Sequence, residues 1–539
     1  MARPEEHAAI CEFFELFKTP WEFHRSGSSY DVLLCSTDED TSRINAQLVL
    51  LYQGAGNDDA ALDTLRNSGF ANSRTLLHKD FELPIYSPIA TFPSRPEPML
   101  IQKETNRTAA YLSNEQGRSV AHLGYNLFAE VAFLLTLGQP CCNASTPTLE
   151  LHIRLLRQLI VESGVNLAEI PPVPQGYRFI VCLTHDVDHP SIRYHKLDRT
   201  MLGFLYRATI GSALNVLRGR ATLKQMLQNW GAAFRLPLVF VNWARDFWLE
   251  FVRYTTLENG LPSSFFVIPF SGRSGRTRAG AAPRHRAAGY GAADIAPYIR
   301  QLKTAGCEIG LHGIDAWIDS SSGIEELREI KAITGTEEIG VRMHWLYFDE
   351  NSPVTLENAG VNYDSTVGYN NQVGYRAGTT QVYKPLQAQR LLELPLHVMD
   401  TALFYPAHLH LTTEEAGRRI RKLVDNAADL GGCLTVNWHD RSIAPERLWQ
   451  QPYLDLIDEA QAKGAWFATA TQAVSWFRKR RETKFEFDST VVERVKLREP
   501  TSTIGDLPAL SLRIHAGPKS QNARVTGEGF NASTPCTTQ

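Results

Sequence analysis

Two aspartates and two histidines directly follow an apolar run in the stretch 179–190. Asp186 and Asp188 are two residues apart, so both side chains lie on the same side of an extended chain. Carboxylates beside imidazoles are suited to hold a divalent metal ion and to supply a general base. Taken alone, the stretch is equally consistent with a solvated strand end that carries ordinary polar caps.

Side chains of the same chemical kinds end later apolar segments of the chain. They are His312, Arg342 with His344, Asp400, and His439 with Asp440. A histidine such as His312, taken alone, is more often a buried core residue than a metal ligand. The recurrence of such residues at the ends of separate segments instead favours one shared site.

Strand and helix patterns alternate about seven times between residues 175 and 480, and they predict how these side chains are positioned. Strands are predicted within 179–190 and 308–317 and at 264–269, 340–345, 361–365, 392–400, 433–440 and 466–469. In a parallel β/α barrel the carboxyl ends of all strands meet on one face, which would gather the polar residues there. A doubly wound sheet is the alternative, but its single crevice collects fewer strand ends.

The stretch from about 178 to 478 resembles the polysaccharide deacetylase family, also called the NodB-homology or carbohydrate esterase 4 domain. Four of the family's motifs are resembled by 184–188, 342–345, 393–400 and 434–440. The remaining motif, His-x-x-x-His, is matched only at His312, because Ala316 occupies the second histidine position. The resemblance implies a distorted (β/α)7 barrel, with Asp186 as the catalytic base and Asp188 as a metal ligand.

The missing second histidine leaves the third metal ligand open. A catalytic metal site normally has three protein ligands and one open position. We favour His344, at the end of a neighbouring strand, over Asp315, which lies three residues from His312. Loss of both metal and activity is a further alternative. Because family members bind zinc or a similar ion, the cofactor expected is a divalent metal, Zn²⁺, with Co²⁺ or Ni²⁺ as alternatives.

The resemblance and the residue types together predict the proton chemistry. Asp186 is expected to take a proton from water, while Arg342 keeps its carboxylate ionised. His439 is the candidate acid for the leaving nitrogen, oriented by Asp400, although a purely structural hydrogen bond between the two is the alternative. The backbone N–H of Trp345 is a candidate donor to the oxyanion.

The predicted activity is metal-dependent hydrolysis that removes an N-acyl group, acetyl by preference, from an amino sugar of a polysaccharide or its precursor. One alternative is hydrolysis of another non-peptide amide on the same fold. Another is a catalytically silent carbohydrate-binding or scaffold protein. Aromatic residues near the proposed face could stack on sugar rings, although such residues more often serve packing. They are Trp317, Trp345, Tyr347, Phe404, Tyr405 and Trp438.

The rest of the 539-residue chain carries fewer chemical signals. Residues 1–170 are predicted to form an N-terminal α/β accessory domain, which lacks a phosphate loop and metal-ligand spacing. Residues 482–539 are predicted to be a small β appendage whose last twenty residues are disordered. The segment 271–290, rich in Gly, Arg and Ala, is predicted to be a mobile loop.

A long helical insertion is predicted at about 191–260, after the first motif. Arg207, Arg218 and Arg220 accompany its apolar pattern, so a basic amphipathic helix at a membrane surface is one hypothesis for the part from 198 to 257. A lid or packing insertion is the simpler interpretation.

Composition limits the classes of partner. The net charge of −3 gives no electrostatic case for nucleic acid. No apolar run approaches 18 residues, so no transmembrane helix is expected, and the first residues lack the pattern of a signal peptide. The default expectation is therefore a cytoplasmic protein with reduced cysteines, with a carbohydrate as its partner and its oligomeric state left open.

Overall fold

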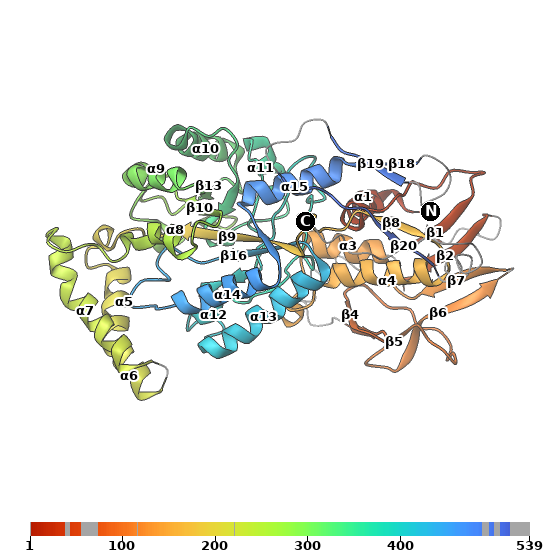
Figure 1. The fold of residues 1–539 in the computed structure, drawn as a ribbon, viewed down its shortest axis with the longest axis horizontal. Coiled ribbons are helices and arrows are strands. Elements are labelled where there is room, and N and C mark those ends of the chain that lie inside the picture. Colours follow the sequence, from red (N-terminus) through yellow and green to blue (C-terminus); the bar gives the residue numbers. More distant parts are fainter. Residues whose placement is uncertain are drawn as a thin grey trace, which may run out of the picture.

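The computed structural model describes residues 2–37, 44–54, 74–115, 117–219, 221–487, 495–500 and 507–517. Figure 1 shows an N-terminal sheet at one end of an elongated molecule, a curled parallel sheet in the middle, and a helical hairpin at the other end. The predicted site residues belong to the middle part.

The curled sheet is organised around β9 (Phe179–Val187), whose nine residues are all buried. Its order is β14-β13-β10-β9-β16-β15, and all of these pairs are parallel. The other strands are β10 (Ser263–Val267), β13 (Glu308–Gly313), β14 (Val341–Met343), β15 (Val398–Met399), β16 (Cys433–Asn437) and β17 (Ala465–Phe467). β17 pairs with the first residues of β9, and β10 pairs with its later residues. β9 is thus central to the sheet, as a strand buried on both faces should be.

An extended stretch, residues 393–399, closes the sheet into a distorted barrel. Asp364 bridges to Val341 of β14, and Glu393 bridges to Asp364, both in parallel. The same stretch then enters β15, which pairs with β16. The predicted barrel class is therefore confirmed, although the strands expected at 361–365 and 392–400 are reduced to single bridges and the two-residue β15. Pro395 lies within the second segment, and a proline cannot donate to a ladder.

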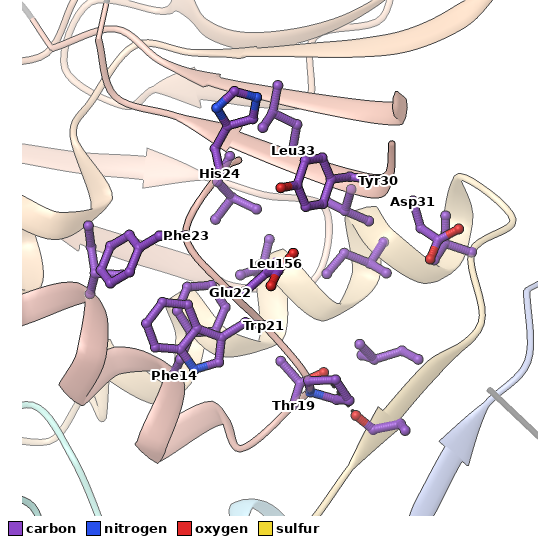
Figure 2. Close-up of a pocket in the computed structure, with 18 of the residues that line it drawn as sticks. Phe14, Thr19, Trp21, Glu22, Phe23, His24, Tyr30, Asp31, Leu33 and Leu156 are labelled. Carbon is purple, nitrogen blue, oxygen red and sulfur yellow. Dashed lines mark hydrogen bonds between the residues drawn. The ribbon is translucent and has the colours of Figure 1, made fainter. Parts of the chain in front are cut away.

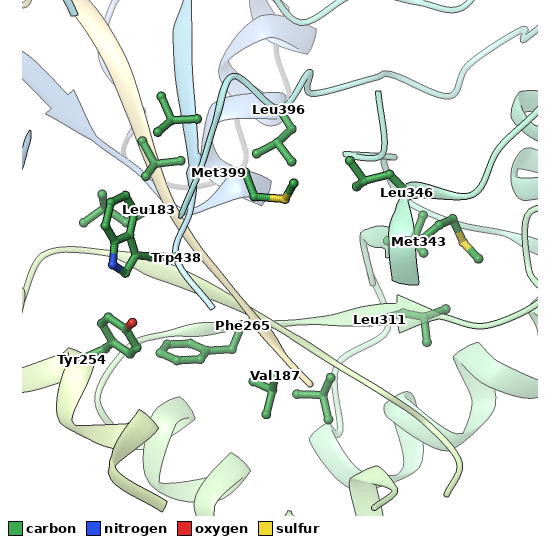
Figure 3. Packing of buried hydrophobic residues seen from close by; sticks show 14 of the residues in the cluster. Leu183, Val187, Tyr254, Phe265, Leu311, Met343, Leu346, Leu396, Met399 and Trp438 are labelled. Atoms are coloured by element: carbon green, nitrogen blue, oxygen red, sulfur yellow. The ribbon is translucent and has the colours of Figure 1, made fainter. Parts of the chain in front are cut away.

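Helices cover the outside of the barrel. They are α9 (Ala296–Thr304), α10 (Ser320–Thr334), α11 (Ser352–Ala359), α12 (Asp400–Phe404), α13 (Thr413–Leu430), α14 (Gln450–Ala462) and α15 (Ala470–Glu482). α10 begins where the Asp319 carboxylate accepts two backbone N–H groups and ends at Gly335, whose φ of 64° is left-handed. Figure 3 shows apolar side chains from several strands, such as Leu183, Phe265 and Leu311, packed in the barrel core.

The N-terminal region builds a separate sheet with the order β1-β2-β7-β6-β5-β3-β4. The elements are α1 (His7–Phe17), β1 (Tyr30–Cys35), β2 (Ala46–Tyr52), β3 (Arg74–Leu77), β4 (Glu82–Ile85), β5 (Leu100–Gln102), β6 (Arg107–Glu115), β7 (Arg118–Leu123), α3 (Leu127–Thr136) and α4 (Thr148–Glu162). None of its described strands pairs with the barrel. Buried polar contacts join the two regions: the Glu150 carboxylate of α4 accepts hydrogen bonds from Thr379 and Thr380.

The C-terminal residues return to the body of the molecule. β18 (Lys484–Phe487) and β19 (Val495–Arg498) form an antiparallel pair, while β20 (Arg513–His515) pairs with β8 (Leu167–Glu169) of the N-terminal region. The tail for which disorder is predicted lies outside the described residues, which end at 517.

The insertion after β9 is helical, as predicted, and stands out from the barrel (Figure 1). It runs through α5 (Arg199–Tyr206), a π-helical turn (Arg207–Gly211), α6 (Ser212–Leu217), α7 (Leu223–Phe240) and α8 (Tyr254–Leu257). A satellite core that includes Phe204, Leu236 and Trp248 holds its helices together. None of the helices in the described part of the chain is long and apolar enough to cross a membrane.

Candidate metal centre and active site

The predicted site residues lie around one cavity of about 440 Å³ at the carboxyl end of the barrel. Five of them line it: Asp186, Asp188, His312, His344 and His439. Arg342 and Asp400 are fully buried behind this lining and contact it through hydrogen bonds. The structure thus brings together all seven residues predicted from the sequence, although their chemical roles stay predictions.

Strand register explains why the residues converge. His312 of β13 and Arg342 of β14 are direct partners in the parallel ladder. Three chain segments each supply two polar residues two positions apart, and the first of each pair lies deeper in the barrel. These pairs are Asp186 and Asp188, Arg342 and His344, and Asn437 and His439. Side chains two positions apart on an extended chain face the same side, so each segment directs both members toward the inside of the barrel.

Asp188, His312 and His344 form the one group of potential metal ligands found among the described residues. Asp188 Oδ1 lies 3.3 Å from His312 Nε2 and 3.6 Å from His344 Nε2. Asp315, the alternative third ligand, is engaged elsewhere, because its carboxylate accepts the backbone N–H of Arg276 at 2.7 Å. Ala316, at the position of the second motif histidine, is buried in the apolar core and does not line the cavity.

The donor set of this group fits a cation. His312 Nδ1 lies 2.9 Å from the Arg342 carbonyl, which can only accept, so Nδ1 carries a proton and Nε2 is turned toward Asp188 Oδ1 at 3.3 Å. That carboxylate oxygen is buried and has no hydrogen-bond partner. Burial lowers the pKa of His344 to about 3, so that ring is neutral. Two imidazole nitrogens and a carboxylate oxygen that converge on one point are a ligand set that suits a divalent cation.

Asp186 is held as an ionised carboxylate beside this group. Arg342 Nη1 donates to its Oδ1 at 3.0 Å, and Asn437 Nδ2 donates to its Oδ2 at 2.7 Å. Burial alone would raise the pKa of Asp186, but the Arg342 guanidinium lowers it below the usual range. The carboxylate is therefore charged, fixed in orientation and close to His312, whose Nε2 lies 4.0 Å from Oδ2.

His439 and Asp400 do meet, as the predicted pairing of their strand ends requires. His439 Nδ1 donates to Asp400 Oδ1 at 2.6 Å, and Ser442 donates to the other oxygen of the same carboxylate. Burial opposes a charge on the imidazole, but Asp400 outweighs it and raises the pKa of His439 to about 9. The ring is thus protonated at neutral pH. Its Nε2 is directed toward the cavity, 3.9 Å from Asp188 Oδ2.

Two residues that support the site were not singled out from the sequence. Asn437 holds Asp186 from the neighbouring strand, and its position two residues before His439 was the available signal. Arg286 is buried and donates to the carbonyl oxygens of Ile314 and His344. It belongs to 271–290, the segment predicted to be a mobile loop, and these hydrogen bonds hold it against the site at this position. Buried donors and carbonyls must find partners, and those of Arg286 tie this segment to the site.

The aromatic residues divide into two groups. Trp345, Tyr347 and Tyr405 line the cavity and are partly exposed. The others, Trp317, Phe404 and Trp438, are buried in the barrel core and cannot stack on a ligand. Trp345 adopts a left-handed φ of 65° directly after His344. Such a conformation is uncommon for a bulky residue and often occurs at functional sites.

A second, larger cavity of about 500 Å³ lies in the N-terminal region (Figure 2). Its wall is mostly apolar and aromatic, with Phe14, Trp21 and Tyr30 prominent in the view. Its titratable residues form none of the metal-binding groups found in the described part of the chain. The convergent chemistry is therefore confined to the barrel cavity.

Comparisons with known proteins return only distant structural matches. No family model matches the chain, and no curated protein matches it. Solved structures do match: a protein assigned as a polysaccharide deacetylase from Mycobacterium smegmatis is 20% identical and covers 57% of this chain and 95% of its own, with a TM-score of 0.36.

Two further matches are carbohydrate esterase 4 proteins. One, a mutant of a pseudoenzyme with restored activity, is 11% identical over 56% of this chain and 68% of its own. The other, an acetyl xylan esterase from Clostridium thermocellum in complex with a cobalt ion, is 14% identical over 55% and 91%. Both have TM-scores of 0.25, so their activities are not transferred to this chain. Its barrel is defined by strand pairing and its site by the distances given above.

Proposed function

We propose that this protein is a metal-dependent hydrolase that removes an N-acyl group, acetyl by preference, from an amino sugar of a polysaccharide or its precursor. One observation carries the proposal: a cation-binding group, a fixed carboxylate and a protonated imidazole line a single cavity. Amide hydrolysis needs all three, because water must be activated, an oxyanion stabilised and the leaving amine protonated.

Asp188, His312 and His344 would hold the metal ion. When bound, a divalent ion supplies a Lewis acid for the amide carbonyl and lowers the pKa of a water ligand towards about 7. Imidazole and carboxylate ligands suit Zn²⁺, with Co²⁺ or Ni²⁺ as alternatives. Arg286 orients the His344 backbone, and the Arg342 carbonyl fixes the His312 ring, so the ligands are positioned by hydrogen bonds.

Asp186 takes the proton of the attacking water. Its negative charge is maintained by Arg342, and its orientation is fixed by Arg342 and Asn437. Each of its oxygens accepts one hydrogen bond from these partners, which leaves a lone pair for the water proton. Because Asp186 and Asp188 face the same side of β9, the base lies next to the cation-binding group.

His439 gives its Nε2 proton to the leaving nitrogen. Asp400 accepts a hydrogen bond from Nδ1–H of His439, so the Nε2–H on the opposite side of the ring is presented to the cavity. A pKa of about 9 keeps this donor charged at neutral pH, and the leaving amine is basic enough to accept its proton. Asp400 therefore acts on the reaction through His439.

The cavity supports a saccharide substrate. Its volume of about 440 Å³ lies within the usual range for small-ligand sites. Trp345, Tyr347 and Tyr405 offer partly exposed aromatic faces at its wall, and such faces pack against the apolar sides of sugar rings.

The test combines metal analysis of the purified protein with measurement of acetate released from N-acetylated oligosaccharides. Wild type should retain a divalent metal and release acetate. Asp186→Asn and His439→Ala should each lower turnover by about 10²-fold or more while the metal stays bound. His408→Ala is the matched control, because His408 lines the same cavity but is given no role in the proposed reaction.

Each alternative has its own signature in this experiment. A silent binding protein would release no acetate in any form and need not retain metal. If the protein hydrolysed a formamide or a cyclic amide and released no acetate, the proposed mechanism of amide hydrolysis would stand. The proposal that the substrate is an N-acylated amino sugar would then be wrong. Near-wild-type turnover of Asp186→Asn or His439→Ala would remove that residue from the mechanism.

A further inference from the structure

The helical insertion exposes an unusual amount of apolar side chain. Twelve of the nineteen large apolar residues that are exposed in the described part of the chain lie between 197 and 243. They are Leu197, Leu202, Tyr206, Ile210, Leu217, Leu223, Leu227, Trp230, Phe234, Leu238, Val241 and Trp243. Leu217, Phe234 and Trp243 are each about four-fifths exposed. Scattered exposed apolar residues are ordinary, but such a concentration marks a surface that is covered in use.

The exposed residues form ordered stripes. On α7 they recur at intervals of three or four from Leu223 to Leu238, which places them on one side of the helix. The buried residues of α7, Asn229, Ala232, Leu236 and Val239, follow the same interval on the opposite side. α7 thus packs one side against the rest of the protein and exposes a second, apolar side. The run from Leu202 to Ile210 repeats this arrangement on α5 and the π turn, where Phe204 and Ala208 are buried.

Charge around these stripes is almost entirely positive. Residues 196–245 contain eight basic residues and a single acidic one, Asp198, whereas the whole chain has a net charge of −3. Lys196, Arg199, Arg218, Lys224, Arg235 and Arg245 are exposed. Apolar and aromatic side chains surrounded by lysine and arginine are the pattern of helices that lie in the interface of an anionic membrane.

We propose that α5, the π turn, α6 and α7, here called the hairpin, dock on the surface of an anionic lipid bilayer. The apolar stripes enter the interface, and the flanking cations contact the lipid phosphates. Trp243, just beyond the end of α7, is suited to the headgroup level, where an amphipathic ring has one polar edge in water. The hairpin lies on the membrane, because none of its helices is long and apolar enough to span it.

Charge also argues against a second copy of this chain as the occupant. A symmetric dimer through the hairpin would place two equally basic surfaces against each other, since an isologous interface uses the same patch twice. Like charges facing each other in this way repel. An anionic surface instead attracts all of the exposed cations at once.

The root of the hairpin is joined to the rim of the active-site cavity. His189, which lines the cavity, contacts His195 at 3.1 Å, and His195 contacts Asp198, the cap of α5, at 2.6 Å. The C-terminal end of the hairpin is held at the same place, because Ser191 donates to Asp246 at 2.5 Å and Arg193 donates to the Val239 carbonyl at 2.9 Å. Docking of the hairpin would therefore hold the rim of the cavity near the lipid surface.

The test measures sedimentation of the full-length protein with lipid vesicles. Wild type should bind vesicles of phosphatidylcholine mixed with phosphatidylglycerol, bind pure phosphatidylcholine far less, and lose binding as salt rises from about 0.1 M to about 0.5 M. The double variants Leu227→Ser with Phe234→Ser, and Lys224→Glu with Arg235→Glu, should each weaken binding by about tenfold or more.

Matched controls carry the same changes elsewhere on the surface. Leu112→Ser with Ile324→Ser removes two exposed apolar side chains, and Arg300→Glu with Arg328→Glu reverses two exposed charges. Both controls should bind like wild type. Absence of vesicle binding by wild type, or equal loss in variants and controls, would overturn the proposal. A wild-type dimer that both hairpin variants convert to monomer, without vesicle binding, would assign the hairpin to a second copy instead. None of these readouts depends on hydrolytic activity.

Discussion

The barrel site and the hairpin depart from the usual distribution of residues in opposite directions. Charged residues are rarely buried and large apolar residues are usually buried. The barrel nevertheless buries Arg342, Asp186 and Asp400, while the hairpin exposes Phe234 and Trp243. Neither departure strengthens the fold by itself. Under the two proposals made above, something outside the chain accounts for each departure: a cation and substrate in the barrel, and a membrane surface at the hairpin.

The two regions differ in how the unusual residues are supported. In the barrel site the buried charges of Arg342, Asp186 and Asp400 have partners of fixed geometry, as Asp186 has in Arg342 and Asn437. The exposed side of the hairpin has no such partners, although its opposite side packs in a core around Phe204. Substitutions in the barrel site and on the inner side of the hairpin should therefore lower the free energy of unfolding markedly. Substitutions on the outer side of the hairpin should change it little.

The largest effect is expected when Arg342 is replaced. Arg342→Met would leave the Asp186 carboxylate buried without its cation, which should cost about 3–5 kcal/mol of unfolding free energy. Arg273→Met is the matched control, because its pairing with Glu325 is half-exposed and should contribute about 0–1 kcal/mol. Urea unfolding measures both. Similar losses in the two variants would show that burial of the Asp186 pair does not determine its contribution.

The hairpin offers a comparison within one element. Phe204→Ala removes a fully buried ring that packs on Phe247 and Trp248, and should cost about 3 kcal/mol. Phe234→Ala removes a ring that is 78% exposed and should change stability by no more than about 0.5 kcal/mol. Thermal unfolding of both variants tests this. A large loss for Phe234→Ala would mean that its ring packs within the chain in solution, against the docking proposal.

Glu150 extends the comparison to a buried carboxylate that has hydrogen bonds but no cation. Burial raises the pKa of Glu150 from its ordinary value of 4.5 to about 7. The folded protein therefore binds a proton more tightly than the unfolded chain, and stability falls as pH rises from about 4.5 to about 7. This shift corresponds to about 3 kcal/mol.

Replacing Glu150 by Gln should remove that contribution. The amide keeps an oxygen to accept the hydrogen bonds of Thr379 and Thr380 but cannot ionise. Unfolding free energies measured from pH 5 to pH 8 should decline less steeply for Glu150→Gln than for wild type. Glu130 is the matched comparison, because burial also raises its pKa to about 7 but its carboxylate accepts hydrogen bonds from Tyr86 and Ser87 of the N-terminal region. Parallel pH profiles for wild type and Glu150→Gln would show that Glu150 does not cause the loss of stability with rising pH.

The sequence predicted the barrel and its principal site residues because both leave local patterns. An apolar run that ends in Asp186 and Asp188, or in His439, predicts a strand and also places its polar end. Pairing between strand ends follows from the barrel, which is why Asp400 could be matched to His439. The weak strands at 361–365 and 392–400 could not be delimited, because their backbone pairing depends on neighbours distant in sequence.

Residues that act through distant contacts were harder to predict. Arg286 lies in a segment rich in Gly and Arg, a composition typical of loops, and only folding brings it to the carbonyl of His344. The pKa of His439 likewise depends on burial and on three carboxylates from two other segments. The exposed stripe of α7 could not be distinguished from its buried stripe, because both are largely apolar and recur at the same spacing.

The smallest expected effect concerns the metal ligand for which the sequence left two choices. His344→Ala removes an imidazole whose Nε2 lies 3.6 Å from Asp188 Oδ1 within the cation-binding group. Two remaining ligands should hold a divalent ion severalfold less well, because three protein ligands are usual in catalytic sites. Asp315→Asn is the control, since Asp315 lies outside the group and accepts the backbone N–H of Arg276.

Metal content after dialysis against a weak chelator measures this difference without any assay of activity. Wild type and Asp315→Asn should retain similar amounts of metal, and His344→Ala should retain severalfold less. The loss is not a consequence of unfolding if the variant keeps its unfolding midpoint in metal-free buffer. That is expected, because His344 is neutral and its removal leaves no buried charge unpaired. Equal metal content in wild type and His344→Ala would exclude His344 as a ligand and leave Asp188 and His312 without their third partner.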